Sequence, residues 1–156
     1  MVTLGVFLVI SSKKSILMSL ISKFEQFYRS VSTHTIEQLD DLYAQDAVLV
    51  DPISEHHGLT NIKNYFHSLL ANTSKCNCLI EHISATNDDI FLTWKMTIAH
   101  PKLNGGSEFV VNGISRLIID NQKVVYHRDY YDLGEMIYEQ VPLLKQVIRT
   151  IKRRLG

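Results

Sequence analysis

Hydrophobic positions recur at helical spacing in the first half of the chain and alternate in the second half. Ser19 to Val31 carries apolar residues three or four positions apart, which predicts an amphipathic helix. Thr35 and Thr60 each stand where an N-cap would stand, before further runs with the same spacing, and predict two more helices. A short apolar stretch, 47–51, is stopped by Pro52 and predicts a strand between them.

After Asn72 the apolar period changes from about 3.6 to about 2, which marks a switch from helix to strand. Strands are predicted at 77–85, 90–99, 107–119 and 122–131. The connections between them are short and polar, so sequential antiparallel pairing is the simplest topology. A final helical stretch runs from about Gly134 to Arg154 and is interrupted or restarted at Pro142. This order of elements predicts an α+β domain, with three N-terminal helices packed on an antiparallel sheet and a C-terminal helix.

The composition is that of one globular domain without an electrostatic preference for nucleic acid. The 156 residues can bury a core, and 46% hydrophobic with 21% charged residues argues against disorder. A formal net charge of zero favours a small partner over nucleic acid. The only cysteines, Cys76 and Cys78, lack a second pair or a nearby histidine motif, so no metal site is expected. We interpret them as inert thiols of a cytoplasmic protein.

The two ends of the chain differ from the central pattern. Residues 1–17 precede the domain pattern and are interpreted as an N-terminal extension that is dispensable, and 18–133 as the domain itself. The apolar run from Leu4 to Ile10 is too short to span a bilayer. Residues 134–156 predict a basic amphipathic helix. We favour a helix that docks on the domain or on a dimer mate, and the alternative is contact with an anionic membrane surface.

Two segments carry a resemblance to known families. Residues 42–52, LYAQDAVLVDP, together with Gly58 and Tyr65-Phe66, resemble a segment of bacterial ketosteroid isomerases. Residues 127–132, HRDYYD, are similar to a segment of limonene epoxide hydrolases. The resemblance covers roughly residues 19–140 and points to the nuclear transport factor 2-like, or SnoaL-like, superfamily. It implies a cone-shaped, cystatin-like roll in which a curved sheet encloses one deep pocket, and it implies a homodimer.

The resemblance also implies roles for individual residues. Asp51 falls where the isomerases keep a general base and the hydrolases a water-positioning asparagine. Asp129 falls on the general base of the hydrolases, and Tyr28 lies near the oxyanion-hole tyrosine of the isomerases. The second oxyanion donor of the isomerases would lie around 113–115, where no carboxylate stands. The Arg-x-Asp of the hydrolases would lie around 94–97, which contains no Asp, so neither mechanism transfers directly.

The residues themselves leave alternatives open. Asp51 closes an apolar strand, so it is expected to lose hydration and suit general-base chemistry, or else to cap a turn. His127, Asp129 and Tyr131 share one strand face and could form a row that points at a ligand. The alternative is a structural ion pair between Asp129 and an arginine such as Arg116.

We therefore expect a pocket protein that binds a small apolar molecule such as a lipid, terpenoid or polyketide-like compound. If it is an enzyme, it would isomerise or hydrate its substrate by aspartate general-base chemistry. The alternatives are a ligand-binding or accessory protein without catalysis and a dimeric interaction module. The candidate catalytic residues are Asp51, Asp129, Tyr28 and His127. The candidate ligand-binding residues are Trp94, Met96, Val111, Gly113, Ser115 and Tyr131, and no metal or organic cofactor is implied.

Overall fold

The structure, a computed structural model, describes residues 3–86 and 89–155, with side chains at 15 and from 17 onward. Its elements are α1 (Thr3–Arg29), η1 (Ile36–Gln38), α2 (Leu39–Leu42), β1 (Tyr43–Val50), β2 (Glu55–His57), α3 (Leu59–Ala71), β3 (Lys75–Ala85), β4 (Asp89–Ala99), η2 (Asn104–Gly106), β5 (Phe109–Asp120), β6 (Lys123–Tyr131), α4 (Leu133–Met136), η3 (Tyr138–Gln140) and α5 (Pro142–Leu155). Within these ranges, none of the helices combines the length and the apolar character that crossing a membrane requires.

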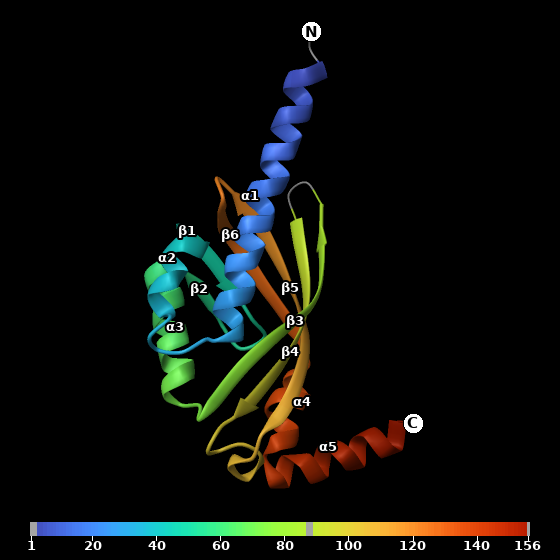
Figure 1. Cartoon of the computed structure of the whole chain (residues 1–156). Helices are drawn as coiled ribbons and strands as arrows, with labels where there is room; N and C mark the ends of the chain where they lie inside the picture. Colours follow the sequence, from blue (N-terminus) through green and yellow to red (C-terminus); the bar gives the residue numbers. More distant parts are fainter. Residues whose placement is uncertain (1–2, 87–88, 156) are drawn as a thin grey trace.

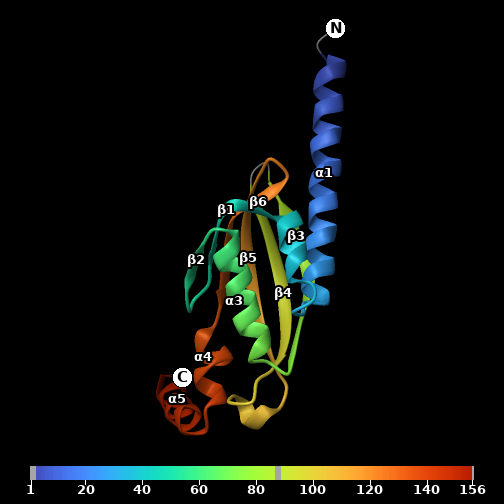
Figure 2. The ribbon, with the colours of Figure 1, turned by 90° about the vertical axis from the view of Figure 1, so that its left-hand side faces the viewer.

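The strands form one six-stranded sheet in the order β2-β1-β6-β5-β4-β3. The antiparallel meander from β3 to β6 confirms the predicted sequential pairing. One pair departs from the purely antiparallel prediction, since β1 lies parallel to β6. The parallel pair is possible because a long stretch of chain, which includes α3 and four strands, separates β1 from β6. Figures 1 and 2 show α3 and the C-terminal half of α1 on the same face of the curved sheet, so the predicted α+β roll is confirmed.

Element boundaries differ from the prediction mainly in the first half of the chain. The first helix begins at Thr3 instead of Ser19, and Leu17 already packs on the core. The expectation that 1–17 can be removed remains a prediction. The strand predicted at 47–51 already begins at Tyr43, as β1. The strand β2 was not predicted, because its three residues are polar and give no alternating pattern.

The core lies between the inner face of the sheet and the helices. Its largest cluster joins α1, α2 and α3 to the sheet through fully buried side chains that include Phe27, Leu39 and Ile62. Burial of each such side chain contributes about 1.5–3 kcal/mol to stability. A second cluster consists of Cys78, Trp94, Ile98, Val111 and Met136. This smaller cluster joins the sheet to α4, at the end of the molecule from which α5 extends (Figure 1).

Close packing against Trp94 explains why position 113 is a glycine. Gly113 of β5 is the register partner of Trp94 of β4. The indole lies so close to Gly113 that an added Cβ would be 2.2 Å from Trp94 Cζ2. Glycine is therefore the residue that lets the indole lie flat over the neighbouring strand.

We predict that Gly113→Ala destabilises the protein by about 1–3 kcal/mol, because the methyl group forces the indole out of its position. Chemical denaturation should show this loss even though alanine is ordinarily better than glycine in a strand. Asn112→Ala, at the neighbouring exposed position, is the control and should change stability little. In a Trp94→Leu background the penalty of Gly113→Ala should shrink, and an undiminished penalty would contradict the packing argument.

Candidate functional site

A cavity of about 60 Å³ lies between the inner face of the sheet and helices α1, α3 and α4. This volume has room for a few water molecules. Its polar lining consists of Asp51, Asp129, Tyr28, Tyr65, Tyr131, Cys76 and Cys78. Its apolar lining consists of Val31, Leu49, Phe66, Leu69, Trp94, Met96 and Met136. The cavity is thus a mainly apolar pocket with two carboxylates and three phenols in its wall.

The structure brings most of the predicted site residues to this pocket. The lining includes Asp51, Asp129, Tyr28, Trp94, Met96 and Tyr131. The other four predicted residues, His127, Ser115, Val111 and Gly113, are not in the lining. His127 and Ser115 lie in the layer behind the lining, where they hold Asp129. Val111 is fully buried in the core, and Gly113 lies under the indole of Trp94.

Asp129 is held by one of its two carboxylate oxygens. Its Oδ1 accepts hydrogen bonds from the Ser115 hydroxyl and, at 2.8 Å, from His127 Nε2. No described residue hydrogen-bonds to Oδ2, and the side chain is 22% exposed. Arg116, the alternative partner, binds Asp89 instead, with 2.7 Å between Nε and Oδ1. Asp129 therefore keeps a free oxygen in the pocket and has no arginine partner in the described structure.

The tautomer of His127 follows from its partners. A carboxylate only accepts hydrogen bonds, so Nε2 carries the proton that points to Asp129. In the neutral ring Nδ1 then accepts a hydrogen bond from the Tyr43 hydroxyl, 2.6 Å away. Tyr43 in turn accepts from the Tyr28 hydroxyl at 3.2 Å. Three donors, Tyr28, Tyr43 and His127, thus form a chain of hydrogen bonds that ends at Asp129.

A second branch of this network begins at Trp94. Its indole Nε1 donates to the Ser115 hydroxyl oxygen across 2.8 Å. Because the indole nitrogen only donates, the Ser115 proton remains available for Asp129. Ser115 is the register partner of Asp129 on the adjacent strand, which brings the two side chains together on the inner face. Side chains of two adjacent strands, Ser115 of β5 and His127 of β6, therefore hold the same carboxylate oxygen.

Asp51 combines the two roles that the sequence left open. Its Oδ1 accepts from the backbone N–H groups of Ile53 and Ser54, each at 2.7 Å, so it caps the turn before β2. Its Oδ2 accepts from the Tyr65 hydroxyl at 2.6 Å, and the residue is 6% exposed. Both oxygens of Asp51 are thus engaged, although the carboxylate lines the pocket.

The phenols of the pocket remain protonated donors near neutral pH. Burial, followed by the charges of Asp51 and Asp129, raises the pKa of Tyr131 above its ordinary value. Burial also raises the pKa of Tyr65 and of Tyr28. The Tyr131 hydroxyl is buried and has no hydrogen-bond partner among the described residues. It is therefore a donor without a partner, carried by a residue of the pocket wall.

The two thiols are part of the pocket wall and are held in the protonated form. Burial raises the pKa of Cys76 to about 11. Burial, with the nearby charge of Asp129, raises the pKa of Cys78 to about 12. Cys76 also contacts the Met96 sulfur at 4.0 Å. Since the thiolate is the reactive form, both groups are poor nucleophiles near neutral pH.

Sequence reasoning did not identify several residues that form or support the site. Among them are Tyr43, Tyr65, Cys76, Cys78 and Met136. Tyr43 and Tyr65 follow the apolar spacing of a helix, and the signal that distinguishes them is a polar tip within an apolar stripe. Met136 lies beyond the last strand, where no local pattern indicates that α4 folds back against the pocket.

Comparison with known proteins identifies the family. The sequence profile of the SnoaL-like domain matches residues 24–127. A protein from Catenulispora acidiphila DSM 44928 with a ketosteroid isomerase-like fold, in complex with trimethylamine, shares 16% identity at a TM-score of 0.68, over 79% of this chain and 92% of that one. TsrD from Streptomyces laurentii shares 14% identity at a TM-score of 0.67, over 81% of this chain and 94% of that one.

A third structure, an NTF2-like protein of unknown function from Burkholderia pseudomallei K96243, shares 12% identity at a TM-score of 0.68. That match covers 77% of this chain and 93% of that one. At such identities these structures are evidence of the fold alone. No curated protein matches the sequence. The chain belongs to the SnoaL-like domain family and has its nuclear transport factor 2-like fold.

Proposed function

We propose that the pocket binds a small, mainly apolar molecule and that Asp129 transfers a proton on it, in an isomerisation or a hydration. The observation that carries this proposal is the asymmetry of Asp129, whose Oδ1 is fixed by Ser115 and His127 while Oδ2 is free. A carboxylate that is positioned in this way inside an apolar pocket is suited to general-base catalysis. No arginine or lysine of the described structure neutralises it.

In an isomerisation, Asp129 Oδ2 takes a proton from a carbon next to a carbonyl group. The electron pair of that C–H bond moves toward the carbonyl oxygen, where the buried Tyr131 hydroxyl donates a hydrogen bond. Asp129 then returns the proton to a different carbon, so the reaction needs no external reagent. In a hydration, the same oxygen would take the proton of a water molecule whose oxygen attacks the ligand.

The remaining candidate residues support these two groups. His127 is 1% exposed and both ring nitrogens are engaged, so it positions Asp129 and does not touch a ligand. Tyr43 fixes the His127 tautomer from behind. Asp51 has both oxygens occupied and is the weaker candidate for the base. Its contribution is to hold Tyr65 and the turn at the pocket wall.

The volume of the pocket restricts the ligand. A space of about 60 Å³ admits one end of a ligand, such as the carbonyl end of a small cyclic ketone, and not a whole polyketide or steroid skeleton. The Catenulispora relative, which is in complex with trimethylamine, agrees with a compact ligand. Met96 and Met136 in the wall are flexible and can adapt to different shapes.

A non-catalytic binding protein is the second candidate function. It is favoured by the lack of a carboxylate around 113–115, where the isomerases keep a second donor. In that case the pocket would still hold its ligand through apolar contacts and the Tyr131 hydroxyl. Both candidate functions therefore predict that the pocket binds a ligand, and only the enzyme would convert that ligand to a product.

The single tryptophan lies in the pocket wall, so its fluorescence reports ligand binding directly. We predict that a compact β,γ-unsaturated cyclohexenone changes the fluorescence of Trp94 and is converted to its conjugated isomer. Asp129→Asn should keep the fluorescence response and lose about 10²–10⁴-fold in the rate of conjugation, because an amide cannot accept the proton. Absorbance of the conjugated enone measures the rate.

Asp46→Asn, at an exposed position of β1, is the matched control and should leave the rate unchanged. Asp51→Asn should slow the reaction less than Asp129→Asn does. A full rate in Asp129→Asn would remove the catalytic assignment. A fluorescence response without turnover in the unmodified protein would favour the binding protein.

The two thiols give a test of how enclosed the pocket is. We predict that iodoacetamide modifies Cys76 about a hundredfold more slowly in the folded protein than in denaturant near pH 8, because the pKa rises from 9.0 to about 11. The rate should increase as the pH approaches 11, and the cyclohexenone should slow it further. Mass spectrometry of tryptic peptides measures both thiols. Equal rates for the folded and denatured chains would contradict burial of the thiols.

We also propose a cytoplasmic homodimer that forms through the outer face of the sheet. Five side chains there are large, apolar and exposed: Leu79, Phe91, Val110, Ile114 and Tyr130. Ile114 and Tyr130 are register partners, so the apolar residues form a patch that extends across β5 and β6. Such a patch is typical of an interaction surface.

Ile114→Asp should convert the dimer to a monomer, since it places a charge in the centre of the apolar patch. Size-exclusion chromatography with light scattering measures the mass. Asn64→Asp, at an exposed position of α3 on the opposite face of the sheet, adds the same charge and should remain dimeric. A monomeric unmodified protein at micromolar concentration would contradict the proposal.

A further inference from the structure

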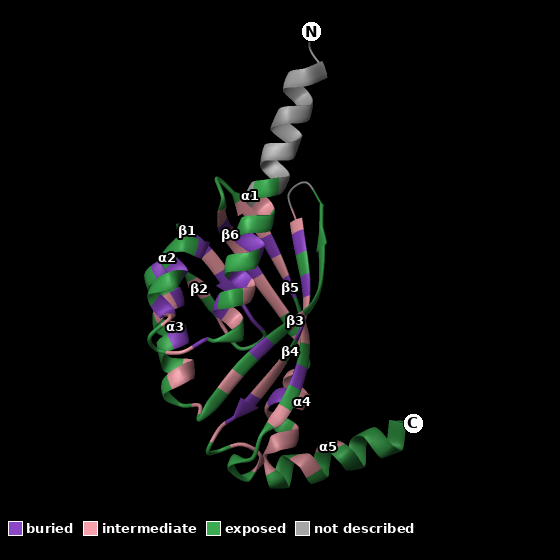
Figure 3. Ribbon diagram, in the orientation of Figure 1, coloured by how far each residue is buried: buried purple, intermediate pink, exposed green. Residues whose placement is uncertain are grey.

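The C-terminal helix α5 is not covered by the rest of the molecule. None of its residues from Pro142 to Leu155 is buried, and Figure 3 shows it mainly in the colour of exposed residues. Figure 1 shows it projecting from the end of α4 and away from the sheet. The apolar residues Leu143 and Leu155 are 78% and 84% exposed. The expected docking of this helix on its own domain is therefore not what the structure shows.

The helix separates apolar and basic residues onto two sides. The apolar side consists of Leu144, Val147, Ile148, Ile151 and Leu155, at helical spacing. Its charged residues are all cations, namely Lys145, Arg149, Lys152, Arg153 and Arg154. Since the whole chain has a formal net charge of zero, this is a local concentration of positive charge.

Only one of these cations has a described carboxylate partner. Lys152 binds Glu139 of η3 and thereby ties the helix to the preceding turn. The other four form no ion pair within the described ranges and remain available to an external anion. The combination of a broad exposed apolar side with unpaired cations beside it is what an interfacial helix needs.

We propose that α5 binds the surface of an anionic lipid membrane, with its apolar side between the acyl chains and its cations at the phosphate groups. The charge pattern favours lipid over a second copy of this chain. Two α5 helices that packed through their apolar sides would bring like charges together, with no carboxylate on either helix to offset them. An anionic bilayer satisfies both sides of the helix at once.

The helix α5 follows the part of the chain that closes the pocket, so membrane binding would bring the pocket close to the lipid. Met136 of α4, in the pocket wall, is separated from α5 only by the short turn η3. A membrane beneath α5 would therefore lie near the end of the molecule where α4 closes the pocket. An apolar ligand could reach the pocket from the lipid phase. The membrane proposal itself rests on α5 alone and does not depend on the proposed catalysis.

Co-sedimentation of the full-length protein with vesicles tests the proposal. We expect binding to phosphatidylcholine vesicles that contain about one-third phosphatidylglycerol, and much weaker binding to phosphatidylcholine alone. Added salt should weaken the binding, because it screens the contacts between arginine and phosphate. Equal binding to both vesicles, or no binding to either, would overturn the proposal.

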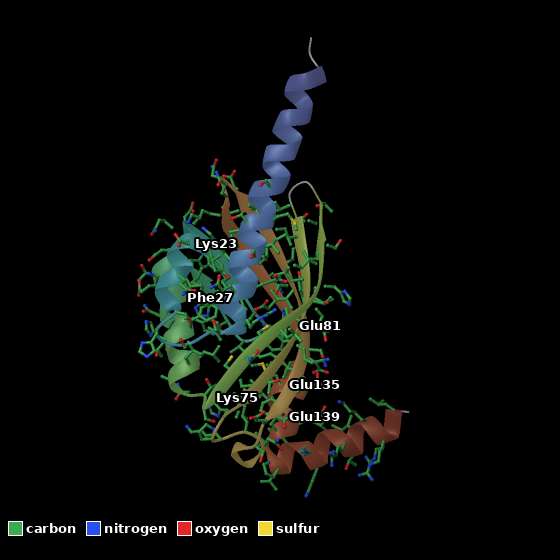
Figure 4. All side chains as sticks on the ribbon, viewed as in Figure 1. Lys23, Phe27, Lys75, Glu81, Glu135 and Glu139 are labelled. Atoms are coloured by element: carbon green, nitrogen blue, oxygen red, sulfur yellow. The ribbon has the colours of Figure 1, made fainter. Side chains whose placement is uncertain are left out.

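Two double variants separate charge from apolar contact. Arg149→Glu with Arg153→Glu should weaken binding more than tenfold. Lys23→Glu with Arg29→Glu, exposed positions of α1, makes the same change in net charge away from α5 and should bind normally (Figure 4 labels Lys23). Normal binding by the first variant, or an equal loss by both variants, would overturn a role for α5.

Val147→Ser with Ile151→Ser keeps all cations and removes two exposed apolar side chains. It should also lose binding to the anionic vesicles, because the apolar side no longer inserts. All these positions are exposed, so circular dichroism should show unchanged folding. If this variant instead changes the oligomeric state in light scattering, and the unmodified protein does not bind the vesicles, the apolar side belongs to a second copy and the lipid proposal fails.

Discussion

The hydrogen bonds that converge on Asp129 determine the architecture of the pocket. They join α1 and β1, through Tyr28 and Tyr43, to His127 and Asp129 of β6. Through Ser115 and Trp94 they continue to β5 and β4. A buried polar group is costly unless it is paired, and here each donor is satisfied by the next. The core and the site are therefore one structure, since a shift of any of these elements would leave a buried donor or acceptor without its partner.

Local periodicity predicted the elements of the second half of the chain and the shared face of His127, Asp129 and Tyr131. It did not predict how deep each residue of that face would lie. Asp129 and Tyr131 line the pocket, whereas His127 is covered by Tyr43 of the parallel strand β1. The contact between Tyr43 and His127 joins positions 84 residues apart, so no window of the sequence contains it. The same limit applies to Met136, because α4 becomes part of the pocket only through the tertiary fold.

Asp51 shows why two interpretations of one residue need not exclude each other. The sequence offered a turn cap or a pocket carboxylate, and the two oxygens serve these roles separately. The turn fixes where the carboxylate lies, and Tyr65 fixes its orientation toward the pocket. Asp129 obtains the same precision from side chains on neighbouring strands and keeps one oxygen free. The two aspartates thus differ in how many of their carboxylate oxygens have hydrogen-bond partners, which residue type does not reveal.

The C-terminal helix α5 shows a second limit of prediction from the sequence. Its amphipathic pattern was evident from the sequence, but whether its apolar side would be covered depended on the position of the body of the protein. Because α5 points away from the sheet, its apolar side chains remain in solvent at a cost that a partner surface would remove. With α5 on a membrane, as proposed, an apolar phase would lie near the end of the molecule where α4 contributes Met136 to the pocket wall. A ligand that passes from the lipid into the pocket would not have to expose its apolar surface to water on the way. The hydrophobic effect would then favour both the binding of α5 to the membrane and the entry of the ligand into the pocket.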